Sequence, residues 1–301
     1  MEAETATLNN GIERLLAAQP PINALQPQAL RDARESGASV FGAIVRVDWA
    51  TERRIPGPAG EITIRQFVPE TVNGICLHIH GGGFVIGRAH HQDVPLAMLA
   101  TRAEVAVLSV DYRLAPENPY PAGPDDCEAA AVWLAAHAKR EFGTDRLLIG
   151  GESAGANLAA VTLLRMRDRH RFTGFSGALL TFGVFDISMT PSARRWGSRN
   201  LILNTPIMQW FSDHYVPAER RQDPDVSPLY ADLSGMPPTI FTVGTLDPLL
   251  DDTLFMQARW VTAGNHAELQ VLPGGLHGFI AFPLEIARRA NERIVQFVRQ
   301  A

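Results

Sequence analysis

The fold is decided by residues 147–157, LLIGGESAGAN, in which a short apolar run leads into a serine flanked by glycines. The apolar start favours a buried strand, and the good helix formers that continue to Met166 favour a helix. Between them, GESAG at residues 151–155 matches the pattern G-x-S-x-G. The pattern predicts a tight turn with Ser153 at its tip, beside the positive N-terminal end of a helix. The alternative is an ordinary strand-to-helix turn that matches by chance.

Length and composition predict one large globular domain. The chain has 301 residues, of which 46% are hydrophobic and 20% charged, so a single domain over residues 1–301 can bury a substantial core. A net charge of −5 without a basic run argues against nucleic acid as a partner. Two cysteines make no disulfide framework, and Cys76, in an apolar strand-like run, is expected to be buried rather than nucleophilic.

The N-terminus and the hydropathy pattern predict a cytoplasmic protein. The first residues, MEAET, are acidic, and no apolar signal-peptide core follows them. No apolar run reaches the length of a membrane span. We therefore expect a cytoplasmic location and no membrane partner.

Strand and helix patterns alternate along most of the chain, which favours the α/β class with an open, mostly parallel sheet and helices on both faces. Besides the serine strand, strands are predicted at residues 46–49, 61–68, 74–80, 105–110, 177–184, 238–244 and 268–272. Helices are predicted at residues 93–101, 124–140, 254–262 and 284–298, besides the one after the serine. The last strand is expected near the sheet edge, where an exposed strand favours a homodimer.

Two segments interrupt the alternation. Residues 1 to about 50 precede the sheet and contain two helical stretches, at 11–18 and 28–36. Residues 186–225 follow a buried strand, are irregular, and carry large apolar side chains, as an insertion would. Both are expected to be additions to the α/β core.

Four predicted strands end in groups suited to nucleophilic catalysis: the triple glycine at 81–83, Ser153, Asp247 and His277. The carboxyl ends of parallel strands meet at one edge of the sheet. A serine hydroxyl needs an adjacent base, an imidazole suits that role near neutral pH, and a carboxylate fixes the tautomer of the imidazole. The sequence therefore predicts Ser153 as nucleophile, His277 as base and Asp247 as the orienting acid.

The other histidines and the aspartates near Asp247 fit these catalytic roles less well. His78 and His80, at a strand end, are expected to make structural hydrogen bonds. The remaining histidines are expected to be solvated: His90, His91, His137, His170, His214 and His266. Asp251 and Asp252 follow Asp247 and are expected to cap a helix.

The triple glycine has two interpretations. A phosphate-binding loop is disfavoured because no Lys-Ser/Thr pair follows it. Beside a G-x-S-x-G serine, glycines are expected where the backbone approaches a ligand closely and presents its N–H groups to a developing oxyanion.

Together these motifs resemble the hormone-sensitive-lipase-like, bacterial esterase branch of the α/β hydrolases. The stretches that carry the resemblance are HGGGF at 80–84, DYRLAPE at 111–117, GESAG at 151–155, DPL at 247–249 and HGF at 277–279. The order Ser, Asp, His is the one expected of that superfamily. Glu152 and Ala156 depart from the residues most common in the branch, Asp and Gly, but keep charge or small size.

The resemblance implies a carboxylic ester hydrolase with no cofactor or metal and a small-molecule ester as its partner. It implies an oxyanion hole from the N–H groups of Gly82, Gly83 and Ala154, and a cap over the site from residues 1–50 and 186–225. Amide, formamide or lactone hydrolysis by the same triad stays open. A non-catalytic receptor on this scaffold is disfavoured because His277 is present.

Large aromatic residues predict a short apolar substrate pocket. The candidates, which could equally pack the cap onto the core, are Phe84, Trp196, Trp210, Phe211 and Tyr215. A pocket closed by such rings favours acyl chains of about four to eight carbons, because each buried methylene stabilises binding only until the pocket is full.

Overall fold

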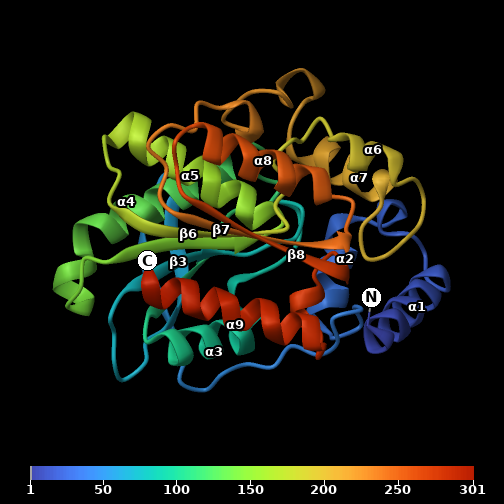
Figure 1. Ribbon diagram of the computed structural model, residues 1–301, viewed down its shortest axis with the longest axis horizontal. Helices are drawn as coiled ribbons and strands as arrows, with labels where there is room; N and C mark the ends of the chain where they lie inside the picture. The colour runs from blue at the N-terminus through green and yellow to red at the C-terminus, as the bar shows by residue number, and fades with distance from the viewer. Residues whose placement is uncertain (1) are drawn as a thin grey trace.

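The computed structural model describes residues 2–301 and is built around an eight-stranded sheet with the strand order β1-β2-β4-β3-β5-β6-β7-β8 (Figure 1). Strand β2 is antiparallel to both of its neighbours, and the remaining neighbouring pairs are parallel. The strands are β1 (Thr51–Gly57), β2 (Gly60–Phe67), β3 (Ile75–Ile79), β4 (Ala106–Asp111), β5 (Leu147–Glu152), β6 (Phe175–Thr181), β7 (Thr239–Leu246) and β8 (Ala267–Leu276). The mostly parallel α/β sheet predicted from the sequence is confirmed.

Helices cover both faces of this sheet (Figure 1). One face carries α4 (Ala122–Phe142), α5 (Ala154–His170) and α8 (Leu250–Thr262), and the other carries α3 (Asp93–Ala103) and α9 (Glu285–Gln300). Strand β3 is buried along its whole length, as a central parallel strand covered on both faces should be. None of the helices in residues 2–301 is long and apolar enough to cross a membrane.

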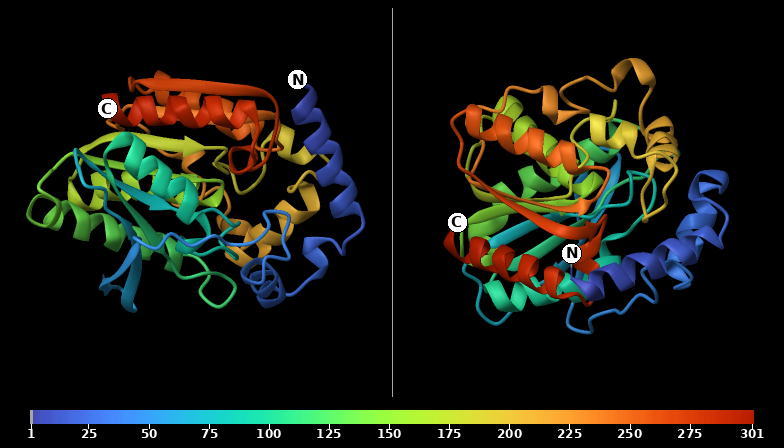
Figure 2. Two further views of the ribbon diagram at one scale, coloured as in Figure 1. Left: turned by 90° about the horizontal axis from the view of Figure 1, so that it is seen from below. Right: turned by 45° about the vertical axis from the view of Figure 1, so that its right-hand side comes forward.

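The two additional segments gather at one end of the sheet (Figures 1 and 2). The N-terminal segment contains α1 (Ala3–Ala17), η1 (Ile22–Ala24) and α2 (Pro27–Glu35). The inserted segment contains α6 (Pro191–Arg195), α7 (Thr205–Tyr215) and η3 (Ala218–Arg220). Short turns of helix also occur at η2 (Ala89–Gln92), η4 (Pro228–Tyr230) and η5 (Phe279–Ala281).

Several element boundaries differ from the prediction. The strand predicted at 46–49 is wrong: this stretch is irregular, and the N–H of Val47 donates to Asp93 at the start of α3 instead of joining the sheet. Strand β6 ends at Thr181 rather than 184, because Phe182 has a positive φ of 35° and turns the chain out of the sheet. Strand β8 lies at the sheet edge, as predicted.

Candidate active site

Ser153 stands at a strained turn between β5 and α5. Its backbone has φ 56° and ψ −120°, a conformation that non-glycine residues rarely adopt. A Cβ atom on Gly155 would lie 1.9 Å from the carbonyl oxygen of Ile79, and one on Gly151 would lie 2.3 Å from the same oxygen. Both flanking positions therefore require glycine, which is the physical reason for the G-x-S-x-G pattern.

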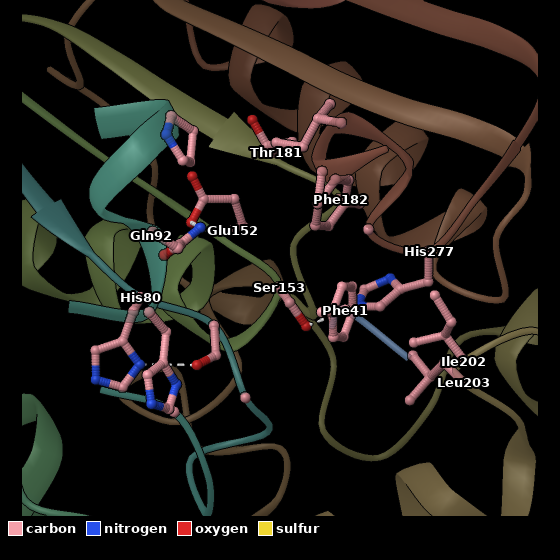
Figure 3. Close-up of a pocket in the computed structure, with 18 of the residues that line it drawn as sticks. Phe41, His80, Gln92, Glu152, Ser153, Thr181, Phe182, Ile202, Leu203 and His277 are labelled. Atoms are coloured by element: carbon pink, nitrogen blue, oxygen red, sulfur yellow. Dashed lines mark hydrogen bonds between the residues drawn. The ribbon is translucent and has the colours of Figure 1, made fainter. Parts of the chain in front are cut away.

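The structure brings Ser153, His277 and Asp247 into one hydrogen-bonded chain. Ser153 Oγ lies 3.0 Å from Nε2 of His277 (Figure 3). Nδ1 of the same ring lies 2.9 Å from Oδ2 of Asp247. His277 follows β8 and Asp247 follows β7, so all three residues lie at the carboxyl edge of the sheet. With Nδ1–H donating to the carboxylate, Nε2 is left free to accept the serine proton.

Asp247 is held in place on its other side as well. Its side chain is buried, and its Oδ1 accepts a hydrogen bond from the N–H of Leu249 at 2.9 Å. The ring of Phe182 packs edge-on against His277, with ring centroids 4.9 Å apart. These contacts restrict the carboxylate and the imidazole to the orientation that the chain of hydrogen bonds needs.

The rival aspartates turn away from this chain. The prediction that they cap a helix is wrong: both lie in the first turn of α8, but neither carboxylate bonds to the helix N-terminus. Asp251 accepts the N–H of Ser192 at 2.7 Å. Asp252 is buried and accepts the N–H groups of Phe185 and Asp186, at 2.8 and 2.9 Å. Both aspartates therefore attach the inserted segment to the core.

The triple-glycine loop lies against the serine. A Cβ on Gly81 would be 3.4 Å from Cβ of Ser153. Gly82 and Gly83 have φ of 120° and 58°, which favour glycine, and their N–H groups donate to no other backbone group within residues 2–301. Ala154 is the first residue of α5, where a helix leaves its N–H unused. These donors come from the two segments that meet at Ser153.

Burial removes two other groups from consideration as base or nucleophile. Burial lowers the pKa of His80 to about 4, which makes this imidazole a poor proton acceptor at neutral pH. Its Nδ1 lies 2.8 Å from the Gly81 carbonyl oxygen, and its ring stacks on Tyr112. Burial raises the pKa of the Cys76 thiol to about 12, which keeps it protonated. His80 therefore has the structural role expected of it.

The remaining histidines divide into two groups. His137 and His214 bond to carbonyl oxygens of their own helices. His170 pairs with the part-buried carboxylate of Glu128, and His266 is exposed, as predicted. The prediction that His90 and His91 are solvated is wrong, because 13% and 8% of their side chains are exposed and both face Glu35.

A polar network that the sequence did not predict lies beside the nucleophile. Glu152 binds Nε2 of His78 at 3.0 Å and accepts a hydrogen bond from Gln92 at 3.0 Å. Nδ1 of His78 lies 2.9 Å from Oγ of Ser109. Burial alone would raise the pKa of Glu152, but the interactions with His78 and Gln92 outweigh it and hold that pKa below its ordinary value.

A cavity of about 1180 Å³ opens onto Ser153 and His277. Figure 3 shows Phe41, Ile202 and Leu203 on the His277 side of the serine, and Gln92 and Glu152 on the opposite side. Apolar lining residues from the two additional segments include Leu16, Leu25, Val40, Phe41, Met189, Ile202, Leu203 and Met208. These lining residues lie far from Ser153 in sequence. They are isolated apolar positions in no recognisable pattern, so the sequence could not identify them as lining the cavity.

Only two of the five predicted pocket aromatics line this cavity. Phe84 and Phe211 do, and the Phe211 ring lies against Gly83, where a Cβ would come within 2.3 Å of it. Tyr215 is instead buried behind Phe84, on which it stacks with centroids 3.8 Å apart. Trp196 donates to a carbonyl of its own segment, and Trp210 packs against His214, so neither is among the lining residues.

Comparisons with known proteins agree with this geometry. A family model described as alpha/beta hydrolase fold matches residues 76–281. The carboxylic ester hydrolase LipN of Mycobacterium tuberculosis is 36% identical over 79% of this chain and 66% of its own length. An ethyl acetate hydrolase of Pseudomonas putida is 31% identical over 92% of this chain and 90% of its own. A hyperthermophilic esterase from the archaeon Pyrobaculum calidifontis has a TM-score of 0.90 at 30% identity, covering 98% and 97% of the two chains. The chain belongs to the α/β-hydrolase family, in its hormone-sensitive-lipase-like branch.

Proposed function

We propose that this hydrolase is a serine carboxylesterase that cleaves short- to medium-chain acyl esters through an acyl-enzyme. The observation that carries the proposal is the chain of hydrogen bonds from Asp247 through His277 to Ser153, at 2.9 and 3.0 Å. Its support comes from the esterases to which the chain is similar in sequence and structure.

In the first half of the reaction, Ser153 Oγ attacks the ester carbonyl while Nε2 of His277 accepts the serine proton. The carbonyl oxygen becomes an oxyanion, which the N–H groups of Gly82, Gly83 and Ala154 stabilise. Asp247 stabilises the imidazolium that forms. His277 then gives its proton to the leaving alcohol, and the acyl group remains on the serine.

In the second half, His277 takes a proton from water, and the hydroxide attacks the acyl-enzyme. The same N–H groups stabilise the second oxyanion, and the proton returns to Ser153 as the carboxylic acid leaves. These residues need no metal or organic cofactor for either half.

Residues 1–50 and 186–225 form the cap of this proposal. Their side chains supply apolar lining on the His277 side of the cavity, and the aspartates of α8 attach the inserted segment to the core. Acyl chains would be bound among these apolar side chains, where burial of methylenes stabilises them.

The experiment is a panel of p-nitrophenyl esters from acetyl to palmitoyl, run on the wild type and on Ser153→Ala. We expect kcat to fall on the order of 10⁴-fold in a folded Ser153→Ala protein, with the remaining rate due to binding and oxyanion stabilisation. Turnover near the wild-type rate in that variant would overturn the mechanism. Matched anilides and lactones in the same panel measure the preference for esters over amide and lactone bonds.

A further inference from the structure

Three potential metal ligands from two distant parts of the chain meet beside the cavity. Glu35 is the last residue of α2, whereas His90 and His91 are neighbours in η2. Their ligand atoms all lie within 4.8 Å of one another, and no other such group of three is found within residues 2–301. The hydrolytic mechanism uses none of them.

The geometry of the group suits an ion between the three side chains. Oε1 of Glu35 lies 3.0 Å from Nε2 of His90 and 2.8 Å from Nε2 of His91. The two rings stand at 89° to each other, so their Nε2 atoms approach the carboxylate from different directions. A tetrahedral zinc ion with bonds of about 2.0–2.1 Å separates its ligand atoms by about 3.4 Å. The two distances from Glu35 would have to lengthen by about 0.4–0.6 Å. The Nε2 atoms of His90 and His91, which lie within 4.8 Å of each other, would have to settle at about the same 3.4 Å separation.

The exposed carboxylate, rather than the two imidazoles, can make most of that movement. Only 13% of the His90 side chain and 8% of the His91 side chain are exposed, so the core holds the two imidazoles in place. The Glu35 side chain is 46% exposed and can adjust. Three protein ligands, one of them the exposed carboxylate, would leave the fourth position of a tetrahedral ion to water.

The chemistry of the donors selects the ion. Two imidazoles with one carboxylate are a donor set that zinc and neighbouring transition metals prefer, whereas calcium and magnesium require mostly oxygen ligands. Arg34 lies next to Glu35, and its positive charge opposes every divalent cation alike, so the donor set alone distinguishes zinc from calcium and magnesium. We propose that Glu35, His90 and His91 form a zinc-binding site.

Zinc at this site would connect the N-terminal segment to the loop that precedes α3. His91 lines the active-site cavity, and η2 begins a few residues after the triple glycine. The ion would therefore fix one wall of the cavity to the segment that contains two of the proposed oxyanion donors, Gly82 and Gly83. Without the ion, the same residues form a hydrogen-bonded group in which each imidazole donates to Glu35.

The test starts from chelator-treated, metal-free protein and titrates zinc chloride by calorimetry and by thermal unfolding. We expect one ion per chain and a Tm that rises by about 2–4 °C once zinc exceeds its Kd about tenfold. Cobalt(II) should give the visible absorption of a four- or five-coordinate site. Absence of zinc binding and of a cobalt spectrum in the wild type would overturn the proposal.

Variants locate the ion. Glu35→Gln and His91→Asn should each abolish the zinc-dependent rise in Tm and the cobalt spectrum. His170→Asn is the matched control, because His170 pairs with a carboxylate at 2.8 Å but belongs to no group of three, and its zinc response should equal the wild type's. A zinc response that survives in Glu35→Gln would place the ion elsewhere, for example on His277, and would overturn the site. If metal-free Glu35→Gln has a lower Tm but the same zinc-dependent rise in Tm as the wild type, the three residues form a hydrogen-bonded group only and the zinc site is wrong.

Discussion

The Glu152 carboxylate lies 3.0 Å from Nε2 of His78, so a largely buried hydrogen-bonded pair adjoins the nucleophile in both sequence and space. Gln92, from the other side, donates a third hydrogen bond to this carboxylate. Removal of one partner from such a pair leaves the other without its compensation, which is costly in a buried environment. The network therefore stabilises the floor of the cavity.

We expect Glu152→Gln to lower the free energy of unfolding by about 1–3 kcal/mol at pH 7, because His78 loses a charged acceptor. The folded-state pKa of Glu152 is below its ordinary value. Its contribution is therefore present above about pH 4.5 and is lost as the pH falls through the folded pKa. Urea unfolding of the wild type and Glu152→Gln at pH 7 and pH 3.5 measures the difference between their free energies of unfolding. This difference should be smaller at pH 3.5. The exposed Glu61→Gln serves as control and should change little at either pH.

Asp247 and Asp251 provide a direct comparison of the two candidate acids. We expect Asp247→Asn to lower kcat on the order of 10⁴-fold, because an amide no longer fixes the tautomer of His277. Asp251→Asn should leave kcat within about threefold of the wild type, since Asp251 contacts the Ser192 N–H and not the imidazole. Steady-state kinetics on p-nitrophenyl butyrate check both. If Asp251→Asn lost kcat on the order of 10⁴-fold while Asp247→Asn kept the wild-type kcat, Asp251 would be the orienting acid instead.

The sheet and the three strand-end residues could be predicted because each leaves a local signal. Apolar runs and glycines mark where β5 ends just before Ser153, and the order Ser, Asp, His follows from the sequence alone. Only glycine fits at positions 151 and 155, so the pattern records a steric requirement of the fold.

The surroundings of those residues could not be predicted, since they depend on which distant side chains meet. Glu35 faces His91 across 56 residues, and Asp252 binds N–H groups about 66 residues away. Phe211 lines the cavity, whereas Trp210, its neighbour in α7, packs away from the cavity. Aromatic character alone could not distinguish these two residues. Helix rotation, set by tertiary packing, decides that difference.

Asp252 should give stability an unusual pH dependence. Burial raises its pKa to about 7, so the folded state binds a proton that the unfolded state releases near pH 4. Its effect is therefore to make the folded protein less stable as the pH rises from about 4 to about 7, by about 1.4 kcal/mol per pH unit. We expect Asp252→Asn, which keeps an acceptor for the Phe185 and Asp186 N–H groups, to become more stable relative to the wild type over this interval.

The measurement is the urea midpoint of wild type and Asp252→Asn at half-unit steps from pH 4.5 to 7.5. Other carboxylates titrate in both proteins, so the contribution of Asp252 is the difference between the two plots of urea midpoint against pH. A difference that stays constant across the range would show that Asp252 has no raised pKa.

Strand β8 should carry an interface between two copies of the chain. It is an edge strand, and Leu269 and Val271 on it are each 38% exposed. Edge strands with exposed apolar side chains pair readily. We expect a dimer in sedimentation at micromolar concentration and a monomer for Leu269→Arg/Val271→Arg. A wild-type protein that remains monomeric at this concentration would contradict the interface.

Phe211 should limit the length of the acyl chain. Its ring lies against Gly83. Because the N–H of Gly83 is a proposed oxyanion donor, the ring lies close to the ester carbonyl that is cleaved. In the wild type we expect the highest kcat/KM at acyl chains of about four to eight carbons and a steep loss beyond about ten, because further methylenes would meet the Phe211 ring. Phe211→Ala removes the ring and should raise the ratio of kcat/KM for dodecanoyl over butyryl esters by roughly tenfold or more, since each newly buried methylene is worth about 0.8 kcal/mol. Trp210→Ala, from the same helix but outside the cavity lining, is the matched control and should leave the ratio unchanged. If palmitoyl esters already exceed butyryl esters in the wild type, or if both variants shift the ratio equally, Phe211 does not set the chain length.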